Sequence, residues 1–237
     1  MLRIENLTKR YGDKKAVDGL SLHIAPGEIC GFIGHNGAGK TTTIKSCCGI
    51  LNFDEGEVYI NGISLKENPL DCKKVLAYLP DNPDLYDFMS GIQFLNFTAD
   101  VFGISALDRK ERIERYASLF ELKNVLAEPI GAYSHGTKQK LAIISALIHD
   151  PKLIIMDEPF VGLDPKASHA VKQLMRDICS RGGAIFFSTH VLEVAEKLCD
   201  RVAIIKNGKL IRCGTMEEVK GDTSLEDIFL ELEGADA

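Results

Sequence analysis

The segment from Gly34 to Thr41, Gly-His-Asn-Gly-Ala-Gly-Lys-Thr, satisfies the pattern GxxxxGK[ST] in full. Its glycines let the backbone curl so that successive N–H groups face one anion, and a helix that begins behind them adds its positive N-terminal end. The apolar run Ile29–Ile33 precedes the segment and a helical pattern over 39–50 follows it, as this chemistry requires. The segment therefore predicts a site for the phosphates of a nucleotide.

Two residues of this phosphate loop have side chains with distinct expected roles. Lys40 would contact the β- and γ-phosphates and so assist their transfer, and the hydroxyl of Thr41 would ligate Mg²⁺. The alternative is a glycine-rich turn with a chance lysine, which leaves both flanks unexplained. The other residues expected to bind the nucleotide here are Gly34, His35, Asn36, Gly37, Ala38, Gly39 and Thr42.

A second candidate lies where the apolar run Leu153–Met156 ends in Asp157 and Glu158. Doubly wound sheets place their ligands at this carboxyl edge, and alternation along a strand gives the two side chains different directions. Asp157 can hold Mg²⁺, directly or through water, while Glu158 can orient and deprotonate the water that attacks the γ-phosphorus. An Asp-Glu pair alone is often only a polar strand end. Together with the phosphate loop, it predicts hydrolysis of a nucleoside triphosphate.

These residues and the order of the remaining ones resemble the ATP-binding cassette family, and the resemblance extends from about Leu2 to Lys209. It implies a P-loop NTPase core of the RecA-like type with an N-terminal antiparallel β part, an inserted α-helical subdomain, and ATP and Mg²⁺ as ligands. Tyr11 matches the aromatic residue that stacks on adenine in this family. The alternative for Tyr11 is a packing residue in a turn beside Gly12.

The segment Tyr133-Ser134-His135-Gly136-Thr137 stands where the family carries its Leu-Ser-Gly-Gly-Gln signature. Ser134 and Gly136 are kept, whereas His135 replaces a glycine and Thr137 a glutamine. In the family this segment lies at a helix N-terminus and touches the γ-phosphate bound by the opposite subunit. The resemblance therefore implies that Ser134, His135 and Gly136 bind nucleotide across an interface between two cassettes. By itself, the pentapeptide is only a helix cap.

Two further matches follow the acidic pair. Asp164, in Gly-Leu-Asp-Pro, looks like the dimer contact of the loop that couples the two sites in the family. Without the family, Asp164 is a helix N-cap with proline at the first helical position. His190 matches the switch histidine, which reaches the γ-phosphate and stabilises developing charge with Glu158. A lone histidine at a strand end would otherwise be an ordinary polar loop residue.

The clearest departure from the family pattern is Asp81, because most members have glutamine at this position as a Mg²⁺ and water ligand. An aspartate is a competent ligand for a hard cation, but it adds negative charge near a polyphosphate. The resemblance therefore assigns Asp81 to the metal. The alternative is a turn residue between Pro80 and Pro83.

The elements that must position these residues follow from apolar runs of strand length, several of them continuous, as in strands covered on both faces. With helical patterns between them, they predict an α/β protein with a largely parallel central sheet. The expected strands are Leu2–Leu7, Leu20–Ala25, Ile29–Ile33, Val58–Ile60, Val75–Leu79, Leu153–Met156, Ala184–Phe187 and Val202–Ile205.

We expect one domain over residues 1–237. Its nucleotide-binding core would comprise 1–81 and 151–220, and 82–150 would form the helical signature subdomain. No convincing strand occurs in that segment, where helical spacing covers 91–102, 108–122 and 138–149. Residues 221–237 would form a short C-terminal helix and tail, opened by Ser224 with Asp227 three residues on.

Composition restricts the partners. A net charge of −6 argues against nucleic acid, which usually requires a basic patch. The longest apolar stretches, such as Leu141–Ile148, fall far short of the roughly 18 residues that span a bilayer, so we expect no direct membrane insertion.

The start lacks a signal-peptide pattern, which predicts a cytoplasmic protein. Seven cysteines without a CxxC pair predict buried free thiols.

The first functional hypothesis is an energy-coupling ATPase. Two cassettes, as a homodimer or a heterodimer, would close on ATP and act on a separate transmembrane permease docked near Asp81 to Phe97, at the inner face of the cell membrane. The tail Ser224–Phe229 and the Tyr-Ser-His-Gly variant resemble bacterial exporter cassettes of the drug, peptide or ABC-2 type, which favours export.

Two other hypotheses belong to different classes. One is a soluble, non-transport ABC ATPase that acts on ribosomes or DNA, but such proteins usually carry two cassettes, long coiled insertions or basic extensions. The other is a P-loop kinase or GTPase. It leaves Ser134 and His190 unexplained, and the sequence has no guanine-reading Asn-Lys-x-Asp.

Overall fold

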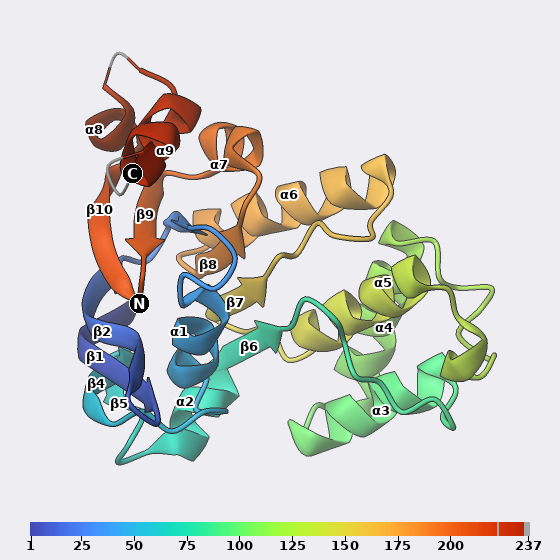
Figure 1. Ribbon diagram of the computed structural model, residues 1–237. Coiled ribbons are helices and arrows are strands. Elements are labelled where there is room, and N and C mark those ends of the chain that lie inside the picture. The colour runs from blue at the N-terminus through green and yellow to red at the C-terminus, as the bar shows by residue number, and fades with distance from the viewer. Residues whose placement is uncertain (222, 235–237) are drawn as a thin grey trace.

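A six-stranded sheet runs through the centre of the computed structural model, which describes residues 1–221 and 223–234 (Figure 1). Five strands are parallel, and the edge strand β10 is antiparallel to β9. In order across the sheet, the strands are β10 (Lys209–Thr215), β9 (Arg201–Lys206), β3 (Ile29–Ile33), β8 (Ala184–Thr189), β7 (Leu153–Asp157) and β6 (Leu76–Leu79).

The inner strands of this sheet are covered on both faces, because every residue of β3, β7 and β8 is buried. On one face Phe32 and Phe186 pack with their rings 5.3 Å apart, in a core shared with the N-terminal strands. On the other face Phe187 and Met156 belong to a core shared with the helices. The continuous apolar runs therefore did indicate strands without a solvent-facing side.

A second, four-stranded sheet is antiparallel and packs over the first face. This sheet confirms the expected N-terminal antiparallel part. Its strands, in the order in which they pair, are β2 (Lys14–Ile24), β1 (Leu2–Tyr11), β4 (Glu55–Ile60) and β5 (Ile63–Ser64).

The helices α3, α4 and α5 follow one another without an intervening strand among the described residues, and all lie inside the segment 82–150. Each begins at a serine that accepts a hydrogen bond from a backbone N–H three residues on. In Figure 1 they lie together on the side away from the four-stranded sheet. They are α3 (Gly91–Val101), α4 (Ala106–Leu119) and α5 (His135–Leu147), with a 3₁₀ turn, η1 (Ile130–Ala132), before α5.

The other helices connect or cover the strands. The longest, α6, buries one apolar face against the central sheet. Within the described residues, none of the helices is both long and apolar enough to cross a bilayer. They are α1 (Lys40–Cys47), α2 (Pro69–Val75), α6 (Pro165–Ser180), α7 (Leu192–Leu198), α8 (Met216–Lys220) and α9 (Leu225–Gly234).

Several sequence-based boundaries were wrong. The strand β10 was missed because it is an edge strand with exposed and charged residues, so no continuous apolar run marks it. Val75, expected in a strand, ends α2 instead. The helix α5 begins at His135 rather than at 138, since Ser134 caps it. Of the predicted tail 221–237, residues 222 and 235–237 lie outside the described residues.

All seven cysteines are free, and six are buried as expected. For Cys213 the expectation was wrong, because this residue is exposed on the edge strand β10. Burial raises the pKa of the Cys47 and Cys179 thiols to about 12. These two thiols are therefore protonated and act as small core side chains.

Candidate active site

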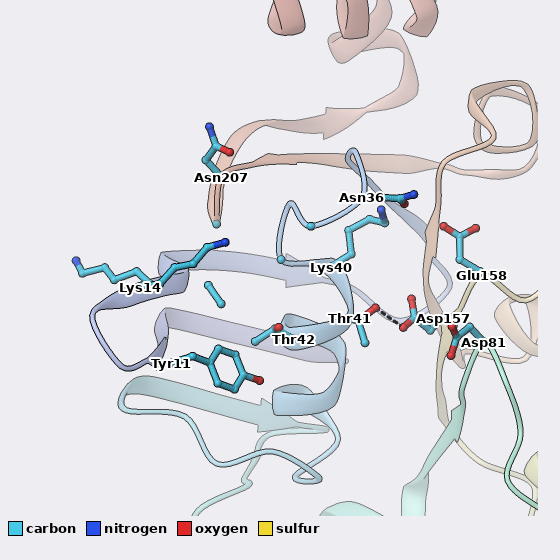
Figure 2. Close-up of a pocket in the computed structure, with 15 residues that line it drawn as sticks. Tyr11, Lys14, Asn36, Lys40, Thr41, Thr42, Asp81, Asp157, Glu158 and Asn207 are labelled. Carbon is cyan, nitrogen blue, oxygen red and sulfur yellow. Dashed lines mark hydrogen bonds between the residues drawn. The ribbon is translucent and has the colours of Figure 1, made fainter. Parts of the chain in front are cut away.

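A pocket of about 600 Å³ opens where β3 and β7 end beside α1 (Figure 2). It brings together predicted residues that lie more than 100 positions apart in the sequence, because parallel strands present their carboxyl ends at one edge. The predicted residues that line it are Tyr11, Asn36, Gly37, Gly39, Lys40, Thr41, Thr42, Asp81, Asp157 and Glu158.

The phosphate loop enters α1 through Gly39, whose backbone has φ of +110°. A Cβ atom at this position would lie 2.5 Å from the carbonyl oxygen of Ala16, so only glycine fits both the conformation and the space. The first turn of α1 starts immediately afterwards at Lys40. The N-terminal N–H groups of α1 are thus directed at the loop, which is the arrangement that binds phosphate.

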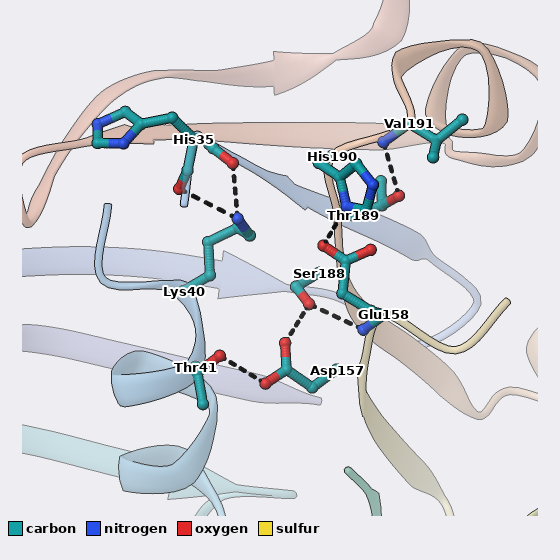
Figure 3. A network of polar contacts seen from close by, with 10 residues as sticks. His35, Lys40, Thr41, Asp157, Glu158, Ser188, Thr189, His190 and Val191 are labelled. Atoms are coloured by element: carbon teal, nitrogen blue, oxygen red, sulfur yellow. Dashed lines mark hydrogen bonds and ion pairs between the residues drawn. The ribbon is translucent and has the colours of Figure 1, made fainter. Parts of the chain in front are cut away.

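Lys40 places its ammonium group inside the loop. Its Nζ donates hydrogen bonds to the carbonyl oxygens of Gly34 at 2.6 Å and His35 at 3.2 Å (Figure 3). Burial lowers the pKa of Lys40, although the negative charges of Glu158 and Asp157 oppose this shift. The only charged side chain of the loop therefore stands between the phosphate-binding backbone and the two carboxylates.

Asp157 is 2% exposed, and both of its carboxylate oxygens accept hydrogen bonds. Thr41 Oγ1 donates to Oδ2 at 2.6 Å, and Ser188 Oγ donates a short bond to Oδ1. Ser188 Oγ also accepts a bond of 3.0 Å from the backbone N–H of Glu158. One serine on β8 thus fixes both acidic residues at the end of β7, where Asp157 and Ser188 are register partners.

These oxygen ligands suit Mg²⁺, a hard cation that is usually held by one or two carboxylates together with phosphate oxygens and water. The hydroxyl of Thr41 and the carboxylate of Asp157 are already in contact. Asp81 lines the same pocket, while its Oδ1 accepts a hydrogen bond from the N–H of Asn82 at 2.8 Å. The bond to Asn82 fits the turn role of Asp81, and its place in the pocket lining leaves the metal role a prediction.

Glu158 and His190 form the outer part of this network. His190 Nδ1 lies 2.9 Å from Glu158 Oε1 (Figure 3). Glu158 has φ of +47°, a conformation that costs a residue with a Cβ of order 1 kcal/mol or more unless the surroundings impose it. The carboxylate faces the pocket, 18% exposed, so it can accept a proton from a molecule bound there.

Tyr11 lies at the end of the pocket opposite Glu158 (Figure 2). Its ring is 53% exposed, with Lys9 Nζ 5.5 Å from the ring centroid. An exposed ring at the edge of a polar pocket is suited to stacking on a flat base. A base that stacks on Tyr11 would occupy the space between its ring and the phosphate loop.

Several lining residues were not expected from the sequence, and they come from the start of β2 and from the turn between β9 and β10. The N–H of Gly208 donates to Ala38 O at 2.8 Å, which places the turn between β9 and β10 against the phosphate loop. Strand pairing determines these contacts, and no local pattern signals them. Ser188, which holds Asp157 and is not among the described lining residues, was also not expected. Its only signal in the sequence was its place at the end of an apolar run. The unexpected lining residues are Lys14, Lys15, Ala16, Asn207 and Gly208.

The remaining predicted residues are not among the described residues that line this pocket. Ser134 caps α5 and accepts a bond from the N–H of Thr137 at 3.2 Å, with His135 and Gly136 in the first turn. Asp164 caps α6 and accepts a bond from the N–H of Ala167 at 2.7 Å. The predicted site thus separates into the pocket with its adjoining residues and a pair of capped helix starts outside it. The adjoining residues, which contact the lining without belonging to it, are Gly34, His35, Ala38 and His190.

Comparisons with known proteins agree on one family. A family model described as ABC transporter matches residues 17–161. The ABC-type transporter ATP-binding protein EcsA of Bacillus subtilis is 34% identical over 100% of this chain and 98% of its own length. The Escherichia coli protein named "Probable multidrug ABC transporter ATP-binding protein YbhF" is 32% identical over 98% of this chain and 41% of its own.

The solved structures agree with this result. An ATP-binding subunit of an ABC transporter superposes with a TM-score of 0.94 at 33% identity, covering 98% of this chain and 99% of that one. The likeness therefore includes the helical segment and both sheets, as well as the phosphate loop.

Proposed function

Because the chain belongs to the ABC transporter family of ATP-binding proteins, we propose that it is the energy-coupling subunit of an exporter that acts on separate membrane-spanning subunits. Family membership makes the chain an ATP-binding enzyme that hydrolyses ATP to ADP and phosphate. The observation that carries the site assignment is the series of contacts that connects Thr41, Asp157, Ser188, Glu158 and His190. Of these residues, Thr41, Asp157 and Glu158 line one pocket together with Lys40.

In the proposed reaction the phosphate loop and Lys40 bind the β- and γ-phosphates, and Tyr11 holds the adenine. Glu158 orients the attacking water and takes its proton, while His190 holds the Glu158 carboxylate in place. A Mg²⁺ ion held by Thr41, Asp157 and Asp81 would neutralise charge on the phosphates.

The capped start of α5 supports a dimer. A helix N-terminus is a favourable place for an anion, yet Ser134 and Gly136 do not line the pocket of their own chain. We therefore assign them to the γ-phosphate bound by a second cassette, either another copy or a related chain. In this arrangement each nucleotide would lie between the pocket of one chain and the α5 start of the other.

An aromatic cluster with three exposed side chains and one partly buried one, Phe94, supports docking on a protein partner. The docking surface, as we call it, consists of Tyr86, Phe88, Phe94 and Phe97, and Tyr86 lies 5.8 to 6.1 Å from each of the other rings. Phe88 is 84% exposed. Exposed aromatic patches of this kind mark protein interfaces. The cluster falls within the predicted docking segment Asp81 to Phe97, so we assign it to the permease at the inner face of the cell membrane.

Export is the finer part of the proposal. It is supported by the likeness to YbhF, whose name refers to multidrug transport. The likeness of the 224–229 segment to exporter cassettes points the same way.

Affinity capture from native membranes tests the partner assignment. The tagged chain should recover a protein with several membrane spans, and Phe88→Asp should lose it because a charge disrupts an apolar interface. The matched control is Ile211→Asp, which places the same charge on an exposed apolar residue of β10. Recovery of ribosomes or DNA instead would overturn the transporter assignment and favour a non-transport ABC ATPase.

A further inference from the structure

The loop from Glu158 to Asp164 joins the end of β7 to the start of α6, and its first residue is strained. Glu158 has φ of +47°, and a non-glycine residue keeps such a conformation only where the surroundings impose it. On one side the N–H of Glu158 donates to Ser188 Oγ at 3.0 Å. Its carbonyl oxygen accepts a bond from the N–H of Val161 at 3.1 Å. His190 Nδ1 contacts its carboxylate at 2.9 Å, and a further restraint comes from the far end of the loop.

That far end is held by α5. Asp164 uses one carboxylate oxygen to cap α6, and its Oδ2 accepts a hydrogen bond from Lys140 Nζ at 2.6 Å. The Lys140 side chain is only 17% exposed, so its position is restricted by packing as well as by charge. The Lys140 ammonium lowers the pKa of Asp164, with a smaller contribution from the Ala167 N–H. Asp164 therefore stays ionised and tied to α5.

The middle of the loop also rests on α5. A Cβ atom on Gly162 would lie 2.5 Å from His135 Cδ2, so the imidazole packs directly on the backbone of Gly162. A Cβ atom on Gly136 would lie 2.8 Å from the carbonyl oxygen of Gly162. Two adjacent residues in the first turn of α5, His135 and Gly136, thus touch the loop at Gly162. His135, which makes the imidazole contact, departs from the family pattern.

From these contacts we infer that Lys140 is a positioning residue for ATP hydrolysis. Lys140 anchors the 158–164 loop to α5, while His135 packs against the middle of the loop. Together these contacts determine the position of the Glu158 carboxylate. Phe160 extends the same restraint inward, because its ring meets Phe187 of β8 edge-on at 5.9 Å. The inference rests on the proposed role of Glu158 as the group that activates water.

A consequence is that turnover depends on where α5 lies. A displacement of Asp164 is transmitted along the seven residues of the loop to the Glu158 carboxylate, which must reach the attacking water. A misplacement of that carboxylate by about 1 Å can cost roughly 100-fold in rate. Lys140 is not among the described residues that line the ATP pocket. Its loss should therefore lower kcat and leave the KM for ATP nearly unchanged.

The test is steady-state ATP hydrolysis by the full chain. We expect Lys140→Ala to lower kcat about tenfold, with KM for ATP within about twofold of the native value. Lys140→Arg should recover at least half of the native kcat, because a guanidinium group can still reach Asp164. The matched control is Lys166→Ala, which removes a lysine ion pair to Glu121 that is 74% and 61% exposed and does not hold Asp164. It should leave kcat unchanged.

A double-mutant cycle separates positioning from a general loss of stability. Asp164→Asn keeps an oxygen for the α6 cap but loses the charge that Lys140 binds. Once Asp164 is replaced, Lys140→Ala should lower kcat no further. If Lys140→Ala does not fold, Lys140→Met keeps the length of the side chain and enters the same cycle.

Three outcomes would overturn the inference: native kcat in a folded Lys140→Ala variant, an Arg variant as slow as the Ala variant, or additive effects in the cycle. The proposed role of Glu158 is checked separately with Glu158→Gln. Full turnover in that variant would overturn both proposals, whereas an inactive Glu158→Gln beside a fully active Lys140→Ala would overturn only this one.

Discussion

The phosphate loop and the first turn of α5 are both helix starts suited to an anion, but they are built differently. Gly39 opens α1 at the bottom of a pocket, with Lys40 and the carboxylates of Asp157 and Glu158, at the end of β7, around it. Ser134 opens α5 in an exposed position outside that pocket, and its hydroxyl is already used to cap the helix. In the first region the charged groups line the pocket, whereas the lysines beside the α5 start are paired with carboxylates of their own chain.

This difference indicates how the work is divided. The pocket brings together in one chain the residues that we assign to binding and cleaving the nucleotide. In the dimer that we propose, the α5 start would contact the γ-phosphate of another chain, since in its own chain His135 and Gly136 lie against Gly162. Changes in the first region should therefore abolish chemistry, and changes in the second should act through assembly.

The largest expected effect comes from Glu158→Gln. An amide cannot take the proton of the attacking water, so kcat should fall by about 100-fold or more. ATP binding should persist because Lys40 and the phosphate loop are unchanged, and the nucleotide-bound dimer should accumulate. Size-exclusion chromatography with ATP and a phosphate-release assay measure the two results.

The control for this variant is Glu193→Gln, which neutralises a carboxylate on α7 that is 74% exposed and paired only with Lys197 in the described ion pairs. It should turn over ATP at the native rate. Equal activity of the two variants would remove Glu158 from the reaction and leave the pocket without a base.

A mixing experiment tests whether the two regions come from different chains. Lys40→Ala destroys the pocket, and Ser134→Arg obstructs the α5 start at a cost of about 1 kcal/mol for the lost cap. Each variant alone should be inactive. Their mixture should regain activity, because a mixed dimer holds one intact pocket facing one intact α5 start. A mixture as inactive as its parts would show that both regions act within one chain.

The sequence predicted the first region more completely than the second. Lys40, Thr41, Asp157 and Glu158 could be placed because a loop followed by a helix and a strand end have fixed geometry, so residue type and spacing define the site. The antiparallel first sheet and the helical segment were likewise expected. The edge strand β10 was not, because an edge strand lacks the apolar pattern of a buried one.

Contacts between distant elements could not be predicted. Ser188 meets Asp157 through the register of β7 and β8, and Lys140 meets Asp164 because the start of α6 lies close to the first turns of α5. Both depend on tertiary arrangement. The family likeness named Asp164 as a dimer contact, but nothing in the sequence indicated that a lysine of the same chain holds its carboxylate.

Ser188→Ala should have a smaller effect on the pocket. It leaves the buried Asp157 Oδ1 without its donor and the N–H of Glu158 without its acceptor, and an unsatisfied buried group costs about 1 to 3 kcal/mol. We expect a lower free energy of unfolding in urea and slower turnover, since both acidic residues lose their common restraint.

Ser46→Ala is the matched control for this prediction. Ser46 is also 0% exposed, but its hydroxyl has no hydrogen-bond partner among the described residues, so its removal should cost little or stabilise the chain. If both alanine variants lose the same stability, the loss reflects serine burial in general and the restraint on the acidic pair is not what Ser188 contributes.

The smallest expected effect concerns His149, which follows α5 and contacts β6 of the central sheet. Its Nε2 lies 3.1 Å from the carbonyl oxygen of Leu76 on β6, and its ring stacks on Phe102 at 3.8 Å. Burial lowers the pKa of His149, with smaller opposing contributions from the Leu76 carbonyl and Asp150 and a further lowering one from Arg112. The folded chain therefore binds the imidazole proton less readily than the unfolded chain.

The sign of the pH dependence follows from this shift. As the pH falls through the ordinary histidine pKa of about 6.5, the unfolded chain takes up the proton first, so the folded chain loses stability. The loss stops below the lowered folded pKa, where both states are protonated. His149→Gln should lack this component, so its urea midpoint should fall less than the native one between pH 8 and pH 5.5. Parallel pH profiles would mean that His149 is protonated equally in the folded and unfolded chain. Burial of its side chain would then not disfavour the charged imidazole.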